Sequence, residues 1–189
     1  MKFIEDIILK EGKVVNNGII KVDSFLNHQI KPEIMREFSN EVAKYFADRG
    51  INKILTIETS GIAVAFSVAE AFGDLPLVFA KKSKSATVDD NVYKARIKSF
   101  TRNMYCDVTI SKNYLSSEDN ILIVDDFLAE GNAACGLIEM CESAGAKVSG
   151  FATVIEKDFQ GGRKKIEAKG IDVFAGAIIK DFKDNKPVF

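Results

Sequence analysis

The chain has 189 residues, of which 47% are hydrophobic and 28% are charged, and its formal net charge is −1 at pH 7. This composition is typical of a soluble globular protein of one domain, and the small charge excludes a general electrostatic attraction to nucleic acid or an anionic membrane. No apolar run approaches the ~20 residues that span a bilayer. Cys106, Cys135 and Cys141 have no metal-type spacing and are odd in number, so we expect a reducing cytoplasm.

The first part of the chain predicts helices and strands in alternation. Apolar residues at helical spacing indicate a helix over Lys2–Lys10 and a longer helix over Pro32–Arg49, which begins with proline and is followed by Gly50. The next elements that we expect are a strand over Lys53–Glu58, a helix over Ser60–Phe72 and a strand over Leu75–Ala80.

The segment Lys81–Tyr105 differs from its surroundings because it is polar, rich in lysine and weakly periodic. It predicts either a long mobile loop or a loose hairpin. A loop of this length in a compact domain is commonly functional or disordered. We therefore expect a mobile loop over about residues 81–105.

Strands and helices alternate again in the rest of the chain. We expect strands over Cys106–Ile110, Ile121–Val124, Val148–Glu156 and Ile171–Ile179, and helices over Gly131–Ser143 and Arg163–Ala168. Alternation with nearly continuous apolar strands predicts an α/β fold, with a parallel sheet covered by helices on both faces. Residues 1–189 should form a single domain, and the parts before Pro32 and after Phe159 should form a cap.

The segment from Ile121 to Ala134 contains the clearest functional signal. Four aliphatic residues end in Asp125 and Asp126, a loop of small residues around Gly131 follows, and a helical pattern then begins. Open α/β sheets bind ligands at the carboxyl ends of their strands, and a helix N-terminus offers unpaired N–H groups to a phosphate. Two acids would repel a bare phosphate, so hydrogen bonds to sugar hydroxyls or a magnesium ion would explain them. The pattern predicts a phosphorylated sugar as the ligand.

This segment resembles the phosphoribosyl-pyrophosphate signature of the purine and pyrimidine phosphoribosyltransferases. Lys21–Gln29, Thr56–Gly61 and Val154–Gln160 are similar to the bacterial, xanthine-specific members in particular. The resemblance implies a central parallel sheet flanked by helices, a small hood over the base site formed by about residues 1–31 and the C-terminal part, and a homodimer.

The resemblance also implies where the activated sugar binds. Asp125 and Asp126 would hold the ribose hydroxyls, and the phosphate loop would be Ala129, Glu130, Gly131, Asn132 and Ala133. Many relatives carry hydroxyl side chains in this loop, so here the backbone N–H groups would hold the 5′-phosphate. Pyrophosphate would meet the turn Glu58, Thr59, Ser60 and Gly61, which without the resemblance is an ordinary helix start, together with Lys81 or Lys82.

Xanthine would be bound by Ile20, Asn27 and Lys157, because an ammonium group satisfies the 6-carbonyl of an oxopurine. Phe159 is expected either to stack on the purine or to lie in the core. The implied reaction transfers the 5-phosphoribosyl group from phosphoribosyl pyrophosphate to N9 of xanthine, with Mg²⁺ bound mainly through the substrate and no residue assigned as its ligand. Alternatives are guanine or hypoxanthine as the base, or a non-catalytic sensor of phosphoribosyl pyrophosphate.

Overall fold

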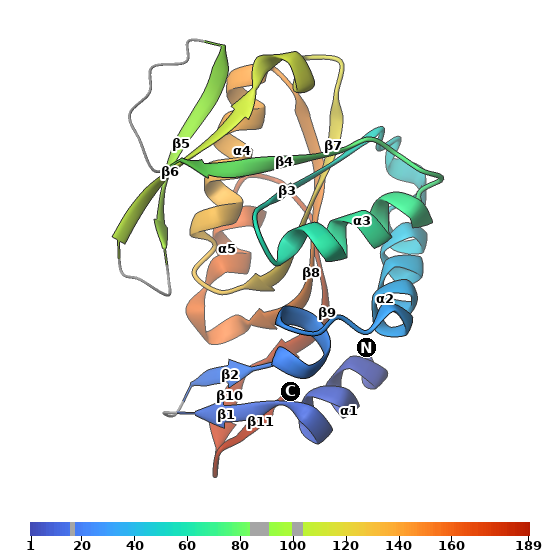
Figure 1. Ribbon diagram of the computed structural model, residues 1–189, viewed down its shortest axis with the longest axis vertical. Coiled ribbons are helices and arrows are strands. Elements are labelled where there is room, and N and C mark those ends of the chain that lie inside the picture. Colours follow the sequence, from blue (N-terminus) through green and yellow to red (C-terminus); the bar gives the residue numbers. More distant parts are fainter. Residues whose placement is uncertain (16–17, 84–90, 100–103) are drawn as a thin grey trace.

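A seven-stranded sheet with the strand order β5-β6-β4-β3-β7-β8-β9 forms the centre of the molecule (Figure 1). The protein is represented by a computed structural model, which describes residues 1–15, 18–83, 91–99 and 104–189. Among these residues, no helix is both long and apolar enough to cross a membrane.

The five strands on one side of this sheet are parallel, as predicted. They are β4 (Leu77–Ser83), β3 (Lys53–Ile57), β7 (Asn120–Leu128), β8 (Lys147–Lys157) and β9 (Val173–Ile179). In β7, Ile121 and Ile123 belong to one hydrophobic core, and Leu122 and Val124 belong to the other. Alternate residues of a strand point to opposite faces. The continuous aliphatic run of β7 is therefore explained by burial on both sides.

Helices cover both faces of the parallel part of the sheet. On one face lie α1 (Lys2–Glu11), α2 (Pro32–Tyr45) and α3 (Gly61–Ala71), whose apolar residues share a core. On the other face lie α4 (Asn132–Ala144) and α5 (Gly162–Glu167). The predicted α/β architecture is thus confirmed.

The predicted loop over 81–105 is largely a hairpin, which was the alternative interpretation. β5 (Val92–Ser99) pairs antiparallel with β6 (Met104–Ser111), and β6 pairs antiparallel with the end of β4. Ala95 and Ile97 are buried in the core that contains α4, whereas Lys94, Arg96 and Lys98 are exposed. This two-residue alternation explains how a lysine-rich segment forms a strand. Residues 84–90 and 100–103 of the predicted loop lie outside the described residues.

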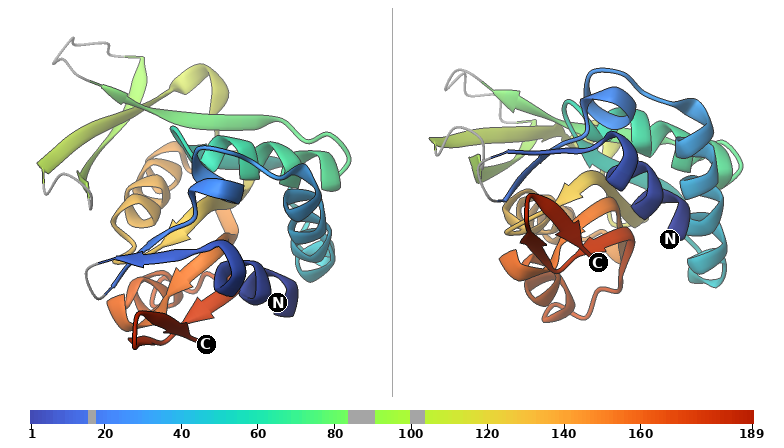
Figure 2. Two further views of the ribbon diagram at one scale, coloured as in Figure 1. Left: turned by 60° about the horizontal axis from the view of Figure 1, so that its bottom comes forward. Right: turned by 90° about the horizontal axis from the view of Figure 1, so that it is seen from below.

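Two short hairpins lie at the same end of the molecule (Figure 2). One is formed by β1 (Lys13–Val15) and β2 (Ile19–Lys21), followed by a π-helical turn over Asp23–Asn27. The other is formed by β10 (Asp181–Lys183) and β11 (Lys186–Val188). The sequence pattern did not predict these strands, because three residues are too few to display a periodicity.

Candidate active site

The two adjacent acids lie inside β7 and not beyond its end, which corrects the prediction. Asp125 pairs in register with Thr153 of β8, and the strand continues to Leu128. The Asp125 side chain is buried, with 7% of its surface exposed, and Asp126 is half-buried. The backbone N–H of Asp126 donates a hydrogen bond of 2.9 Å to Asp125 Oδ1. The sheet therefore holds both carboxyl groups in defined positions.

The environment of Asp125 favours its protonated form. Burial is the main reason why its pKa lies well above the ordinary value, and the negative charge of Asp126 raises the pKa further. The positive charge of Lys82 acts in the opposite direction. A ligand that brings hydrogen-bond donors or positive charge to this carboxyl group would therefore relieve an unfavourable environment.

The predicted pyrophosphate turn packs directly against the acids. Gly61 begins α3 at the end of this turn, and a Cβ atom added to it would lie 2.8 Å from Asp125 Oδ1 and 2.4 Å from Thr56 Oγ1. Only glycine permits this approach. The peptide bond between Glu58 and Thr59 in the same turn is cis.

Glu58 connects this turn to β4. Its Oε1 atom accepts a hydrogen bond of 2.6 Å from the backbone N–H of Lys82, and its own N–H donates to Ala80 O at 3.0 Å. The two lysines proposed from the sequence differ in their surroundings. Lys82 lines the cavity beside the acids, whereas the Nζ atom of Lys81 lies 5.9 Å from the centre of the Phe79 ring. Neighbouring residues of a strand point to opposite faces, which separates them.

The predicted phosphate loop connects β7 to α4. Gly131 has φ = 77°, a conformation that favours glycine, and it immediately precedes the first residue of α4. The side chains of Glu130 and Asn132 bond to each other, with Asn132 Nδ2 lying 3.0 Å from Glu130 Oε2. These side chains are engaged locally, which leaves the backbone N–H groups of the loop and the start of α4 as donors for an anion.

Lys157 lies at the last position of β8, and only 5% of its surface is exposed. Its Nζ atom donates to the carbonyl oxygen of Gly18 at 3.1 Å and lies 5.9 Å from the centre of the Phe127 ring. Burial lowers its pKa from the ordinary value. Lys157 therefore joins the sheet to the N-terminal hairpin, to which Gly18 belongs.

A cavity of about 620 Å³ brings these groups together. It extends from the N-terminal hairpin to the phosphate loop, and three of the predicted residues, Thr59, Gly61 and Lys81, do not line it. The predicted residues that do line it are Ile20, Asn27, Glu58, Ser60, Lys82, Asp125, Asp126, Ala129, Glu130, Gly131, Asn132, Ala133 and Lys157. Residues that are far apart in the sequence thus share one continuous site.

Comparison with known proteins identifies the family. The family model for the phosphoribosyl transferase domain matches residues 21–184. The chain belongs to the phosphoribosyltransferase family. It is 50% identical over 189 residues to the xanthine phosphoribosyltransferase of Clostridium tetani, covering 100% of both chains. It is 46% identical to the enzyme of the same name from Listeria monocytogenes, covering 100% of this chain and 98% of the relative.

Solved structures of other phosphoribosyltransferases share the fold. The adenine enzyme of Trypanosoma brucei superimposes with a TM-score of 0.78 at 14% identity, covering 97% of this chain and 83% of the other. The enzyme from Giardia lamblia gives a TM-score of 0.75 at 24% identity, covering 88% and 93% of the two chains. These similarities support the phosphoribosyltransferase arrangement of sheet and helices.

Sequence reasoning missed one aromatic residue of this phosphoribosyltransferase cavity and considered another that lies elsewhere. Phe127 follows the two acids and lines the cavity. Phe159 is 49% exposed, does not line the cavity, and packs edge-on against Phe182 of β10 at 5.9 Å between ring centres. Phe159 therefore lies neither in the core nor in the cavity. The position directly after Asp125 and Asp126 is the sequence feature that could have indicated that Phe127 lines the cavity.

A metal ion in this site would depend on the substrate for most of its ligands. Among the described residues, no group of three or more His, Cys, Asp or Glu side chains could hold a metal ion. Magnesium is commonly bound by one or two carboxylates together with substrate phosphates and water. Asp125, Asp126 and Glu58 fit that limited role, because all three line the same cavity.

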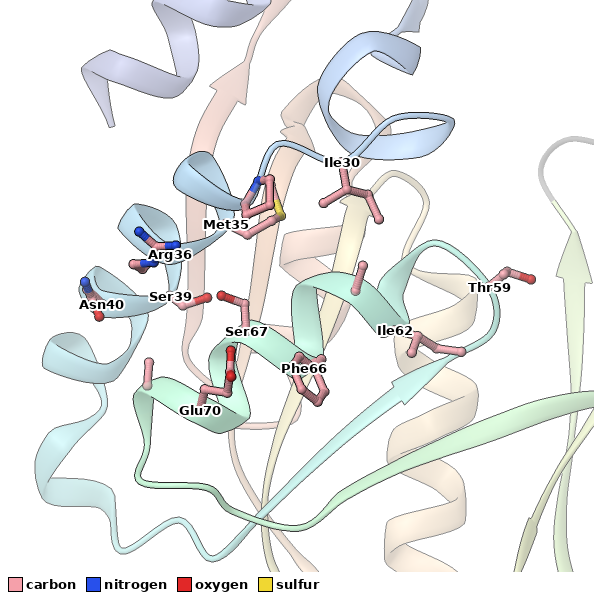
Figure 3. A pocket seen from close by; sticks show the side chains of 13 residues that line it. Ile30, Met35, Arg36, Ser39, Asn40, Thr59, Ile62, Phe66, Ser67 and Glu70 are labelled. Atoms are coloured by element: carbon pink, nitrogen blue, oxygen red, sulfur yellow. The ribbon is translucent and has the colours of Figure 1, made fainter.

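A second hollow lies along α2 and α3, and Thr59 in the turn before α3 is one of its lining residues (Figure 3). This groove has a volume of about 810 Å³, and most of its lining is apolar. Phe66 lies on its α3 side with 58% of its surface exposed. Arg36 of α2 and Glu70 of α3 add one charge of each sign. The predicted pyrophosphate turn thus contributes residues to both hollows, Glu58 and Ser60 to the cavity and Thr59 to the apolar groove.

Proposed function

We propose that this chain transfers the 5-phosphoribosyl group from phosphoribosyl pyrophosphate to N9 of xanthine, which yields xanthosine 5′-monophosphate and diphosphate. The observation that carries the proposal is one cavity lined by the loop before α4, by two carboxyl groups and by a buried ammonium group. The curated relatives from Clostridium tetani and Listeria monocytogenes, which match the whole chain, are named for this activity.

The activated sugar would occupy the phosphate loop and the middle of the cavity. Backbone N–H groups of Ala129–Ala133 and the start of α4 bind the 5′-phosphate. Asp125 and Asp126 accept hydrogen bonds from the ribose hydroxyls, and these bonds offset the free-energy cost of burying the Asp125 carboxylate. The turn Glu58–Gly61 and the ammonium group of Lys82 meet the pyrophosphate. Thr59 and Lys81 have no contact with the cavity in this conformation, so Lys82 is the lysine that we assign.

The base would lie between Lys157 and the N-terminal hairpin. The Lys157 ammonium group donates to the 6-carbonyl of an oxopurine, whereas adenine has an amino donor at that position. A buried donor without a partner costs about 1–3 kcal/mol, which corresponds to roughly tenfold to hundredfold discrimination. Ile20 supplies an apolar contact, and Asn27 supplies both a donor and an acceptor for the ring edge. Guanine and hypoxanthine share the 6-carbonyl, so the names of the relatives favour xanthine.

No covalent nucleophile is needed for this reaction. C1 of the ribose develops oxocarbenium character as the bond to pyrophosphate breaks, and N9 of the base attacks the same carbon. The protein supplies positioning and charge compensation, with Asp125 and Asp126 on the hydroxyls and Lys82 on the leaving group. Asp125, Asp126 and Glu58 are the carboxylates that would help to hold a magnesium ion bound mainly through the substrate, and the ion would supply positive charge to the leaving group. We propose a cytoplasmic location, which suits the free cysteines.

An assay of nucleotide formation tests this function. The protein is incubated with phosphoribosyl pyrophosphate, Mg²⁺ and each of xanthine, guanine, hypoxanthine and adenine, and the products are separated by chromatography. We expect the highest kcat/KM with xanthine and a kcat/KM with adenine that is lower by about tenfold to hundredfold. A preference for guanine or hypoxanthine would overturn the choice of base, and the absence of product with every base would overturn the enzyme assignment.

We also propose that the protein is a homodimer whose subunits meet at the groove along α2 and α3. In a two-fold symmetric contact, the same surface of both subunits is used, so residue i meets residue j and j meets i. Arg36 of α2 and Glu70 of α3 line the same groove (Figure 3), and the proposal pairs Arg36 of each subunit with Glu70 of the other. The exposed ring of Phe66 would be covered at the same time. Thr59 would then connect the pyrophosphate turn to the interface.

Light scattering with charge-reversal variants tests the interface. Wild-type protein should have the mass of a dimer. Arg36→Glu should dissociate it at micromolar concentration because two like charges would then face each other at each end of the contact. The double variant Arg36→Glu with Glu70→Arg should restore the dimer. A dimer that is unaffected by the single change would place the interface elsewhere.

A further inference from the structure

Helix α5 contacts the phosphate loop through residues that do not line the cavity. The backbone N–H of Gly162, the first residue of α5, donates to the carbonyl oxygen of Ala129 at 3.0 Å. The Nζ atom of Lys165, within the same helix, donates to the carbonyl oxygen of Glu130 at 2.7 Å. Two consecutive carbonyl groups of the loop are therefore bonded to α5.

These two bonds determine where the loop's donors point. In a trans peptide, the C=O of one residue and the N–H of the next point in opposite directions across one rigid plane. The carbonyl groups of Ala129 and Glu130 are held toward α5. The N–H groups of Glu130 and Gly131 are therefore directed away from α5. A phosphate in the cavity needs donors with this orientation.

The close approach of α5 to the loop depends on glycine. A Cβ atom added to Gly162 would lie 2.4 Å from Ala129 O and 2.8 Å from Gly131 N. A Cβ atom added to Gly131 would lie 3.0 Å from the Cα atom of Gly162. Any side chain at position 162 would therefore push α5 and the loop apart, and the two carbonyl contacts would lengthen.

A buried ion pair fixes α5 itself. Arg163 binds both carboxylate oxygens of Glu156, with Nε–Oε1 and Nη2–Oε2 distances of 2.8 and 2.5 Å, and its Nη1 atom donates to Val173 O at 2.9 Å. Glu156 is completely buried in β8. A buried carboxylate requires such a partner. Glu156 immediately precedes Lys157, so the end of β8 carries the base-site lysine on one face and the anchor of α5 on the other.

We propose that Gly162 and Lys165, held by the Arg163–Glu156 ion pair, are positioning residues that direct the N–H groups of the phosphate loop toward the 5′-phosphate. The inference rests on the proposed function, because it requires a phosphorylated sugar in the cavity. None of these four residues lines the cavity. They act through the loop backbone, and the short α5 segment connects the phosphate end of the site to the strand that ends in Lys157.

Two lysines of α5 provide a matched comparison. Lys164 and Lys165 are adjacent and exposed, and only Lys165 bonds to the loop. In Lys165→Met, the affinity for ribose 5-phosphate, measured by calorimetry, should fall about threefold to tenfold, as expected for one lost hydrogen bond. The KM for xanthine and the melting temperature should stay at wild-type values. Lys164→Met should match wild type in all three measurements.

The variant Gly162→Ala extends the comparison to the backbone contact. We expect a larger loss of ribose 5-phosphate affinity than in Lys165→Met, because the added methyl group displaces both carbonyl contacts. If Lys165→Met binds ribose 5-phosphate like wild type, or if Lys164→Met loses as much affinity, the positioning role is wrong. If wild-type protein itself does not bind ribose 5-phosphate or phosphoribosyl pyrophosphate, the proposed function fails instead.

Discussion

In the proposed function, the two ends of the cavity recognise their ligands by different means. At the proposed phosphate end, the recognising groups would be backbone N–H groups between Ala129 and Ala133, where Glu130 and Asn132 bond to each other. At the proposed base end, recognition would depend on side chains, above all on the buried ammonium group of Lys157. Backbone recognition suits the 5′-phosphate of phosphoribosyl pyrophosphate, the substrate that stays the same whichever base is used. Side-chain recognition suits the base, which distinguishes one substrate from another.

This difference predicts how each end tolerates substitution. At the phosphate end, ligand affinity should fall when a larger side chain displaces the loop backbone. At the base end, ligand affinity should fall when a single functional group is removed. Between the two ends lie Asp125 and Asp126, which would contact the ribose whatever the base. Substitutions at the acids should therefore reduce activity with every purine, and substitutions at the base end should change the relative activity with different purines.

Asp125→Asn should have the largest effect of the single changes. The variant loses a charged acceptor for a ribose hydroxyl in a buried site, so kcat/KM should fall about a hundredfold. The loss should be similar for xanthine and guanine, measured by steady-state kinetics. A loss confined to one base would contradict the assignment of Asp125 to the sugar.

The same variant tests the raised pKa of Asp125. The folded protein should bind more protons than the unfolded chain between the ordinary pKa of 3.8 and the higher pKa in the folded state. The free energy of unfolding of the wild type should therefore decrease as the pH rises through this window. The part of the decrease that comes from Asp125 should be absent in Asp125→Asn. Urea unfolding at several pH values measures it. An identical pH dependence in both proteins would show that burial does not perturb this carboxyl group.

Lys157→Met should separate the two ends of the cavity. We expect the KM for xanthine to rise about tenfold or more because the 6-carbonyl loses its charged donor, while the KM for phosphoribosyl pyrophosphate stays within about twofold. Lys147→Met is the matched control, because Lys147 is an exposed lysine at the other end of the same strand, β8. Equal increases in both KM values would contradict the base-binding role.

Phe127→Leu and Phe159→Leu form the pair with the smallest expected effect. Phe127 lines the cavity beside Lys157, so loss of its aromatic face should raise the KM for xanthine about threefold to tenfold. Phe159 lies outside the cavity, and its replacement should change this KM by less than about twofold. The reverse order of effects would indicate that Phe159 moves over the base when substrates bind.

Much of the fold could be predicted because the parallel strands are buried on both sides. A strand such as β7 reads as an uninterrupted aliphatic run, and the helices between strands show the periodicity of one buried face. The hairpin of β5 and β6 was harder to recognise. One face of β5 is a row of exposed basic residues, Lys94, Arg96 and Lys98, and the charge concealed the alternation with Ala95 and Ile97.

The candidate site could be predicted in its segments but not in the direction of each side chain. Lys81 and Lys82 have the same chemistry and adjacent positions, and only the pairing of β4 determines which of them faces the cavity. Thr59 belongs to the predicted pyrophosphate turn, yet it lines the groove along α2 and α3 and not the cavity beside the acids. Adjacent residues in a turn or strand point in different directions, so a motif specifies a segment more reliably than it specifies contacts.

The sequence by itself determined the α/β class, the pair of adjacent acids followed by a loop of small residues, and the resemblance to a family of transferases. These features are local, because they follow from the periodicity and chemistry of consecutive residues. Only the tertiary structure decided that α5 holds the carbonyl groups of the phosphate loop, that Gly61 packs against Asp125, and that Lys157 meets the N-terminal hairpin. Each of these contacts joins residues that are distant in the chain, and their distances are set by the packing of whole strands and helices.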